Sequence, residues 1–205
     1  MSARASSFIC FSDVRTAFKN GRHLPVPGTA ETAASAEAEM NYQIRELRKK
    51  EYRILGEYIY RAIYSPPGTP RPPVSIVGTP AMQVYIENFG SRRDDFALAA
   101  ETSGLIIGAV WARIMNDFGH IDDRTPSLAL AVHESCRGRG IGTALMKTMI
   151  AALTKRGYSR VSLSVQKSNP AFRLYRRLGF ETVGRTMGET EEEIVMCRRL
   201  GPDCA

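Results

Sequence analysis

The chain has 205 residues, of which 43% are hydrophobic and 24% charged, values typical of a soluble globular protein with one domain and a tail. No apolar run approaches the roughly 20 residues that span a bilayer, and the amino terminus lacks the apolar block of a secretory signal. We therefore expect a cytoplasmic protein that does not bind membranes. The net charge of +7 favours an anionic partner, which is nucleic acid, acidic lipid or a phosphorylated small ligand.

The four cysteines, Cys10, Cys136, Cys197 and Cys204, are scattered along the chain. They lack the close pairs of a metal site or of a small disulfide framework. We expect reduced thiols and no metal ion.

Residues 1–39 lack sustained periodicity and end in a low-complexity polar stretch from Glu31 to Glu39. Such a stretch buries too little surface to order itself, so we expect a disordered extension followed by one domain over residues 40–205. Because Met40 stands where the first patterned segment begins, one hypothesis makes it the true start. The alternative is a transit peptide, which Asp13 and the acidic end of the segment disfavour.

From Met40 onward the pattern predicts a mixed α/β domain. Its first half contains a strand over residues 41–48, a helix over 52–63, a proline-rich loop over 65–73 and a short helix from Thr79 to Gly90. Strands over residues 96–101 and 105–115 then form a hairpin through the short turn at 102–104.

The second half begins with a strand from Leu128 to Val132, whose continuous apolar run predicts burial on both faces. A helix from Ile141 to Gly157 and a strand from Val161 to Val165 follow. This βαβ unit should have parallel strands and a right-handed crossover. A helix from Pro170 to Leu178 and strands over residues 180–183 and 194–198 complete the domain.

A glycine-rich turn, Arg137-Gly138-Arg139-Gly140-Ile141-Gly142, separates the buried strand from the helix. Free amides and the positive end of the helix dipole converge there, and glycines let phosphate oxygens approach the amides. The turn lacks the Gly-Lys-Ser/Thr of a nucleoside triphosphatase loop. The next strand ends without the acidic residue that binds a dinucleotide ribose.

These residues resemble the GNAT superfamily of acyl-CoA N-acyltransferases. Arg137, Gly140 and Gly142 match its central motif, and the segments Asn169-Pro170-Ala171, Leu174-Tyr175 and Leu178-Gly179-Phe180 match its second motif. The resemblance covers roughly residues 40–200. It implies a mixed central sheet of six to seven strands with a splayed parallel pair, flanked by about four helices.

The resemblance also implies the activity, in which an acetyl group moves from acetyl-CoA to a primary amine by direct attack in a ternary complex. The splayed strands would hold the pantetheine arm through backbone groups of Leu130, Ala131 and Val132. The remaining cofactor-binding residues that it implies are Arg137, Gly138, Arg139, Gly140, Ile141, Gly142 and Thr143 at the pyrophosphate, and Asn169.

Tyr175 would protonate the departing thiolate. Because it follows Leu174 on the helix, we expect it to point away from a core stripe of Leu174 and Leu178 and towards the cleft. Asn169 before Pro170 is also the expected helix cap, and the two roles of Asn169 can coexist.

The general base stays open, because the need for one depends on the acceptor. Deprotonating a lysine-like amine at neutral pH costs about 4 to 5 kcal/mol, whereas an α-amine costs only about 1 kcal/mol. The candidates are Glu101, His120, Asp122, Asp123, Glu134 or a chain of water molecules.

We expect the acceptor, a small molecule or a peptide amine, to bind near residues 64–89, where Tyr64, Tyr85 and Phe89 are candidate contacts. The sequence allows a monomer or a homodimer. A non-catalytic acyl-CoA sensor or interaction module is the alternative function. Nucleic-acid binding is disfavoured, because no aromatic-basic stacking pattern is present.

Overall fold

The computed structural model describes residues 41–188 and 192–201, so the predictions for residues 1–39, Met40, Cys10 and Cys204 lie outside it. The strands in these residues are β1 (Gln43–Glu46), β2 (Phe96–Thr102), β3 (Leu105–Arg113), β4 (Ser127–Val132), β5 (Arg160–Gln166), β6 (Glu181–Met187) and β7 (Glu192–Arg199). The α-helices are α2 (Leu55–Ala62), α3 (Pro80–Gln83), α4 (Ile141–Lys155) and α5 (Ala171–Arg177). Short 3-10 helices cover Lys49–Ile54, Val74–Gly78 and Glu134–Cys136.

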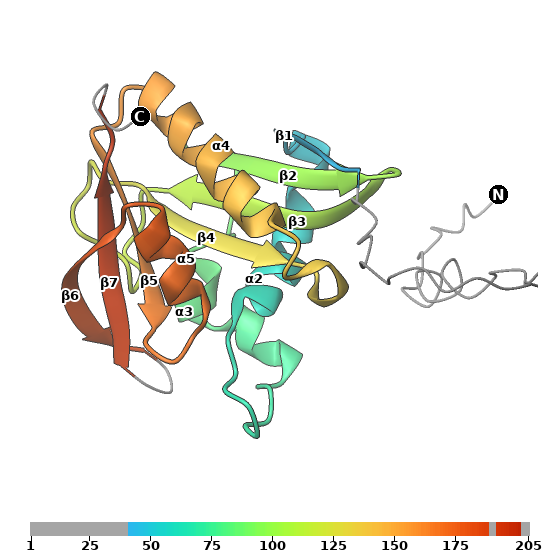
Figure 1. The fold of residues 1–205 in the computed structure, drawn as a ribbon, viewed down its shortest axis with the longest axis horizontal. Helices are drawn as coiled ribbons and strands as arrows, with labels where there is room; N and C mark the ends of the chain where they lie inside the picture. Colours follow the sequence, from blue (N-terminus) through green and yellow to red (C-terminus); the bar gives the residue numbers. More distant parts are fainter. Residues whose placement is uncertain (1–40, 189–191, 202–205) are drawn as a thin grey trace, which may run out of the picture. The chain divides into compact units, whose positions relative to one another are not determined.

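All the described strands form one mixed sheet in the order β1-β2-β3-β4-β5-β7-β6 (Figure 1). Its neighbouring strands are antiparallel except for β4 and β5, which are parallel. The predicted fold class, a mixed sheet with a central parallel pair and about four helices, is confirmed. In the part of the chain that the structure describes, no helix has the length and apolar character needed to span a membrane.

Each face of the sheet packs against its own core. α4 and α5 cover one face of the sheet, and α2 and α3 lie on the other (Figure 1). Residues of α4 and α5 share one core cluster with Leu128 of β4, and residues of α2 and the α3 region share the other with Ala129 and Ala131. This pattern is expected, because successive side chains of a strand point to opposite faces of the sheet. The prediction that β4 is buried on both faces is confirmed for Leu128, Ala129 and Ala131, whereas Leu130 and Val132 are only half-buried.

β4 and β5 pair at a single register position, Ser127 with Ser162. The Ser162 amide donates to the carbonyl of Pro126 at 2.9 Å, and beyond that point the two strands share no ladder within the described residues. We call the place where they diverge the fork. It lies at the start of β4, so the gap between the strands widens towards their carboxyl ends.

The segment from Thr79 to Gly90 differs from the predicted helix, because α3 ends at Gln83 and tight turns follow. Arg113 donates to the carbonyls of Val84 and Glu87, at 3.2 and 2.8 Å. These contacts from β3 hold backbone acceptors that a longer helix would use for its own ladder. A tertiary contact therefore overrides the local helical pattern.

Other boundaries also shift from the predicted ones. The first helix begins as a 3-10 turn at Lys49, β3 ends at Arg113 rather than Met115, and β6 continues to Met187. Edge pairing extends β6, because its ladder with β7 runs to Met187 opposite Glu192.

A buried ion pair fixes the turns after α3 to the sheet. The Arg113 guanidinium donates to both Asp95 carboxylate oxygens, at 2.6 and 2.9 Å, and both side chains are at most 1% exposed. Burial opposes ionisation of Asp95, but bonds from Arg113 and from the amides of Arg92 and Gly90 outweigh it and lower its pKa. The folded state therefore favours the charged carboxylate.

Asp95→Ala should lower the free energy of unfolding by about 3–5 kcal/mol, because it leaves the buried Arg113 charge unpaired. The matched control Glu192→Ala removes an exposed ion pair with Arg185 and should cost less than about 1 kcal/mol. Urea denaturation measures both. Since the folded pKa of Asp95 is lowered, its contribution is complete above the unfolded pKa and disappears as pH falls through the folded value. Equal losses in the two variants would contradict this assignment.

Candidate functional site

The glycine-rich turn leads from β4 into α4 through two left-handed glycines, Gly138 at φ 78° and Gly140 at φ 76°. Both are exposed, and a Cβ added at either would meet no atom within 4 Å. No side chain caps α4 at Gly140, so its first amides are left without a capping side chain. The turn therefore combines positive φ, open space and helix amides that suit an anion.

The start of α4 is packed against both β4 and α5. Ile141 is 1% exposed, so this residue of the motif belongs to the core. A Cβ added at Gly142 would lie 3.7–3.8 Å from side-chain atoms of Leu130, Val132 and Leu174. Residues of β4 and α4 that the sequence assigns to the cofactor therefore come together at the wide end of the gap, beside Leu174 of α5.

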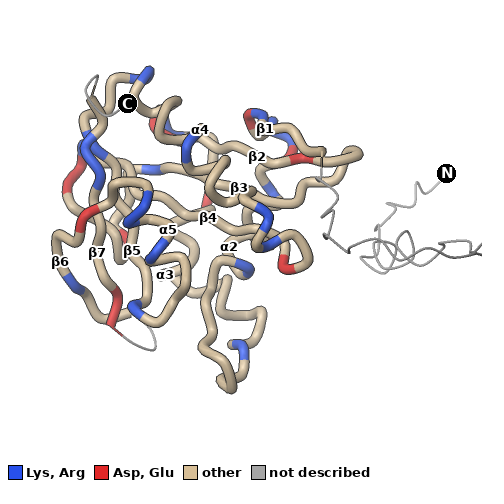
Figure 2. Tube along the Cα trace, viewed as in Figure 1, with Lys and Arg blue, Asp and Glu red and all other residues tan. Residues whose placement is uncertain are grey.

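Arg137 links the glycine-rich turn to β4 and to the end of α2. Its Nε donates to the carbonyl of Val132 at 3.2 Å, and its Nη2 to the carbonyl of Arg61, at the end of α2, at 3.4 Å. Arg139 is exposed on the same turn. Basic residues also cover α5, whose last turn carries Arg176 and Arg177 (Figure 2). The wide end of the gap is thus bordered by positive charge.

The backbone groups of β4 alternate between its two neighbours, as in any antiparallel ladder. His133 donates its N–H to the carbonyl of Ile107 of β3 at 2.8 Å, so Ala131, two residues earlier, also directs its backbone groups to β3. The ladder register pairs Ala131 with Ala109. β3 therefore occupies these groups, which corrects the prediction that Ala131 offers them to the cofactor.

Leu130 and Val132 have the opposite orientation. The carbonyl of Pro126 accepts a hydrogen bond from Ser162 of β5. Every second residue of a strand directs its backbone groups to the same side, so the backbone groups of Leu130 and Val132 also face β5. β5 has no ladder with them beyond the fork. They are the backbone groups that an extended ligand between the strands would meet, although Arg137 already binds the Val132 carbonyl.

Tyr175 does not point away from the core, which corrects the prediction from its place in the helix. It is 8% exposed and shares the α4/α5 core cluster with Leu178, whereas Leu174 is only half-buried. Its ring lies 6.0 Å from that of Phe180. Burial raises the pKa of Tyr175 to about 12, so its hydroxyl keeps its proton at neutral pH.

Asn169 acts on the start of α5. Its Oδ1 accepts a hydrogen bond from the Ala171 amide at 2.9 Å, a capping contact with Pro170 between the two residues. α5 begins at Ala171 with Pro170 as its cap residue, one residue later than predicted, because the first turn of a helix frays.

Each of the five side chains considered as general bases has a partner within the described residues. Glu101 pairs with Arg45, and Glu134 with Arg71 at 2.8 Å. The remaining partners are Met115 for His120, Thr125 and Arg160 for Asp122, and His120 for Asp123, whose side chain is 97% exposed. Within residues 41–188 and 192–201, no three side chains of His, Cys, Asp or Glu form a group suited to a metal ion.

Two of the three proposed acceptor contacts lie apart from the fork. Phe89 packs edge-on against Tyr52 at 5.0 Å, a core contact. Tyr64 donates to the carbonyl of Ser168 at 3.2 Å and so links the end of α2 to the segment between β5 and α5.

A polar cluster at the fork escaped the sequence analysis. We call Tyr85, Asp117, Gly119 and Ser127 the fork cluster. The Ser127 hydroxyl donates to Asp117 Oδ2 at 2.7 Å, while Asp117 Oδ1 is buried and has no partner among the described residues. No sequence signal separates Asp117 from Asp122 or Asp123, because the fold of the loop alone decides which of them is buried.

Close packing holds this loop at the fork. A Cβ added at Gly119 would lie 2.7 Å from Ser127 Oγ, 2.8 Å from the carbonyl carbon of Leu163 and 2.9 Å from the amide of Ser164. Two of these atoms belong to the β5 backbone and cannot yield easily. Glycine is therefore required here by close approach rather than by φ.

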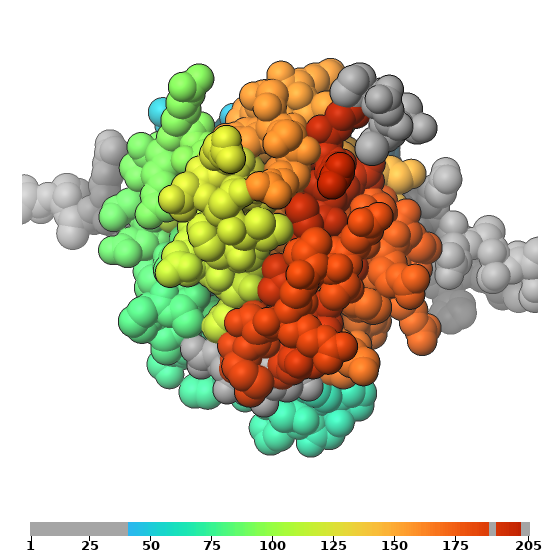
Figure 3. All heavy atoms as spheres, turned by 90° about the vertical axis from the view of Figure 1, so that its left-hand side faces the viewer, coloured from blue at the N-terminus to red at the C-terminus, as the bar shows by residue number. Residues whose placement is uncertain are grey.

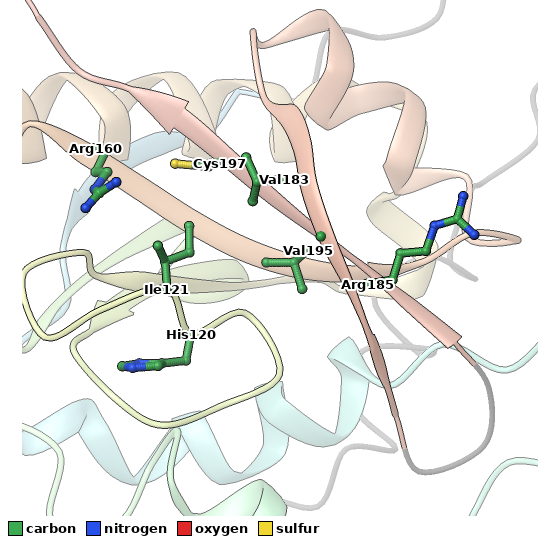
Figure 4. Close-up of a pocket in the computed structure, with 8 residues that line it drawn as sticks. His120, Ile121, Arg160, Val183, Arg185, Val195 and Cys197 are labelled. Atoms are coloured by element: carbon green, nitrogen blue, oxygen red, sulfur yellow. The ribbon is translucent and has the colours of Figure 1, made fainter.

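A cavity of about 350 Å³ lies beside the same loop and is distinct from the glycine-rich turn. It is lined by His120, Ile121, Arg160, Val183, Gly184, Arg185, Val195 and Cys197 (Figure 4). In Figure 3 the yellow-green loop before β4 borders the orange-red strands of the carboxyl-terminal half. Two arginines line the cavity, so it does not suit the ammonium form of an amine.

Comparison with known proteins identifies the family. Residues 57–180, more than half of the chain, match the model of the acetyltransferase (GNAT) family. An acetyltransferase of Pectobacterium atrosepticum is 36% identical over 102 residues, which cover 49% of this chain and 68% of that protein.

Solved structures share the fold. A GNAT-family acetyltransferase from Streptococcus pneumoniae aligns with a TM-score of 0.58 at 20% identity and covers 78% of this chain and 100% of that one. The phosphinothricin acetyltransferase of Sinorhizobium meliloti, solved in complex with AcCoA, aligns with a TM-score of 0.56 at 20% identity, covering 79% and 90% of the two chains.

The chain therefore belongs to the GNAT acetyltransferase family, as its two motifs predicted. It is an N-acetyltransferase, as the enzyme hypothesis predicted.

Gly119→Ala should lower the free energy of unfolding by about 1–3 kcal/mol, because its methyl group would overlap the β5 backbone. The matched control is Gly78→Ala, where the added methyl group would meet no atom within 4 Å. We expect the control to change stability by at most about 0.5 kcal/mol. Thermal and urea denaturation measure the difference, and equal stability of the two variants would show that the loop does not press against β5.

Proposed function

We propose that this acetyltransferase takes its acetyl group from acetyl-CoA bound between β4 and β5, and transfers it to a primary amine in a ternary complex. The observation that carries this proposal is the gap beyond the fork, where the backbone groups of Leu130 and Val132 face no strand. An extended ligand can pair with such groups as an added strand would. The gap ends at the glycine-rich turn, so one ligand can reach both.

The turn suits the diphosphate of the cofactor. Gly138 and Gly140 keep the approach to the α4 amides open, and the helix dipole adds a favourable field for an anion. Thr143 lies in the first turn of α4 and is half-buried. Arg139 is exposed beside the amides, where it can add a charge-assisted contact.

Tyr175 is proposed as the acid that supplies a proton to the departing thiolate. The hydroxyl is protonated at neutral pH, because burial raises its pKa to about 12. That pKa is well above that of a free thiol, about 8.5, so complete proton transfer to the thiolate is uphill. We therefore assign Tyr175 mainly the donation of a hydrogen bond that stabilises the developing negative charge on sulfur.

Gly138→Glu should weaken acetyl-CoA binding about tenfold or more, because it places a carboxylate beside the amides that receive the diphosphate. Gly104→Glu is the matched control, since Gly104 has the same φ of 78° and equally open surroundings. Backbone strain and added charge are therefore alike in both variants. Titration calorimetry measures the binding. Equal affinities for the two variants would contradict the diphosphate site, and no binding by the wild type would refute the proposed function.

Tyr175→Phe should lower kcat by about a hundredfold or more while leaving the dissociation constant for acetyl-CoA unchanged. The control Tyr158→Phe alters a half-buried tyrosine outside the gap and should keep full activity. Because the pKa of Tyr175 is about 12, its ionisation should produce no fall in activity between pH 7 and 10. Thiol release under single-turnover conditions measures the rate, and an unchanged rate in the phenylalanine variant would remove Tyr175 from the mechanism.

A further inference from the structure

Asp117 in the fork cluster is a carboxylate without a full set of partners. Its Oδ2 accepts from Ser127, which is fully buried, while its Oδ1 is buried and unpaired in the described part of the chain. A buried polar atom normally has a hydrogen-bond partner, and a buried charge normally has a counter-ion. The arrangement therefore suits a ligand that brings hydrogen-bond donors and positive charge.

The position of the cluster follows the proposed path of the cofactor. With the diphosphate at α4, the arm runs back along β4 from Val132 towards Ser127. A strand rises about 3.3 Å per residue, so these two residues lie about 17 Å apart. The thioester would therefore approach the narrow end of the gap, where Ser127 holds Asp117.

The cluster and Tyr175 lie on opposite faces of the sheet. Tyr175 belongs to the core beneath α4 and α5, whereas Tyr85 belongs to the core beneath α2 and the α3 region. Ser127 shares the second face, because its side chain has the same orientation along β4 as Ala129 and Ala131. An amine can thus enter from the face opposite the group that serves the leaving thiolate.

The surroundings of Asp117 favour a cation. Tyr85 interacts with Asp117 and Ser164, and its pKa is raised well above the ordinary value by burial, with the charges of Asp117 and Glu193 adding to the effect. Glu193 belongs to β7 and Ser164 to β5. Burial also raises the pKa of Asp117, while bonds from Ser127, Tyr85 and the Gly119 amide oppose that shift. The two charges that raise the pKa of Tyr85, those of Asp117 and Glu193, are therefore both negative.

We propose that Asp117 is the acceptor-binding carboxylate of this enzyme, which holds the ammonium group of an alkylamine and takes one proton from it. The inference rests on the proposed function. The neutral nitrogen then attacks the thioester carbon, so that a C–N bond forms and the C–S bond breaks. The thiolate is stabilised by Tyr175 and gains a proton. The nitrogen loses its second proton as the amide forms, and one net proton is released.

Tyr85 is a positioning residue in this scheme. Tyr85 opposes the rise that burial causes in the pKa of Asp117, so it favours the ionised form, which is the form that binds and deprotonates an ammonium ion. Its main chain is also fixed, because Trp111 Nε1 donates to the Tyr85 carbonyl at 3.2 Å. Tyr85 therefore sets the proton affinity of Asp117 rather than reacting itself.

The test compares Asp117→Asn with the wild type on two amines. Benzylamine is an ammonium ion at neutral pH, whereas aniline is uncharged. With benzylamine we expect a loss of about a hundredfold or more in kcat/KM, the usual contribution of a general base. With aniline the loss should be below about tenfold, because no ammonium proton has to be removed. A purely structural role would lower both rates equally and would overturn the proposal.

Glu87→Gln is the matched control, because it neutralises an exposed carboxylate two residues from Tyr85 and should leave both rates unchanged. Asp122→Asn tests the rival carboxylate on the same loop. A selective loss with benzylamine in the Asp122 variant, but not in the Asp117 variant, would move the role to Asp122. Titration calorimetry with acetyl-CoA tests the proposed function independently of Asp117, because Asp117→Asn should bind acetyl-CoA as the wild type does.

Tyr85→Phe provides a second measurement should Asp117→Asn fail to fold. Removing the hydroxyl removes a bond that favours the carboxylate, so the pKa of Asp117 rises. The ascending limb of the pH profile of kcat/KM with benzylamine should therefore move to higher pH, with no such shift for aniline. An unchanged profile would overturn the assignment of Asp117. Wild-type protein that binds acetyl-CoA but acetylates neither amine would count against both proposals.

Discussion

Backbone pairing between β4 and β5 stops after Ser127 and Ser162, and the rest of the site depends on this interruption. Parallel strands in the middle of a sheet normally satisfy each other's amides and carbonyls. Here the groups of Leu130 and Val132 lose that partner within the sheet, while packing on both faces keeps the strands in place. The sheet thus offers unpaired backbone groups to a ligand between two central strands rather than at an edge strand.

Two elements hold the gap at its ends. At the wide end, Arg137 binds the Val132 carbonyl, and Gly142 in the first turn of α4 packs close to Leu130. At the narrow end, the loop before β4 places Gly119 against the β5 backbone. At the first end the helix amides are open to an anion, and at the second end a carboxylate is buried. In the proposed mechanism these ends receive the diphosphate and the amine.

Some segments of the chain follow their local sequence signals and others do not. The apolar run of β4, the glycines of the turn and the capping pair Asn169 and Pro170 carry local signals, and the parallel pair and the family followed from them. Tyr175 was assigned the wrong orientation, because helical spacing defines faces relative to one another and not which of them is buried. The helix predicted to reach Gly90 was shortened by Arg113, which lies on a strand some 25 residues away.

The sequence by itself determined the order of the elements, the place of the glycine-rich turn and membership of the GNAT family, since each depends on neighbouring residues or on motif spacing. Tertiary structure alone decided which backbone groups of β4 face the gap and which aspartate of the loop is enclosed. Asp117 and Asp122 are equivalent as sequence, but one contacts Ser127 at the fork and the other Arg160 at the surface. Burial depends on contacts between segments far apart in the chain, and no local pattern records them.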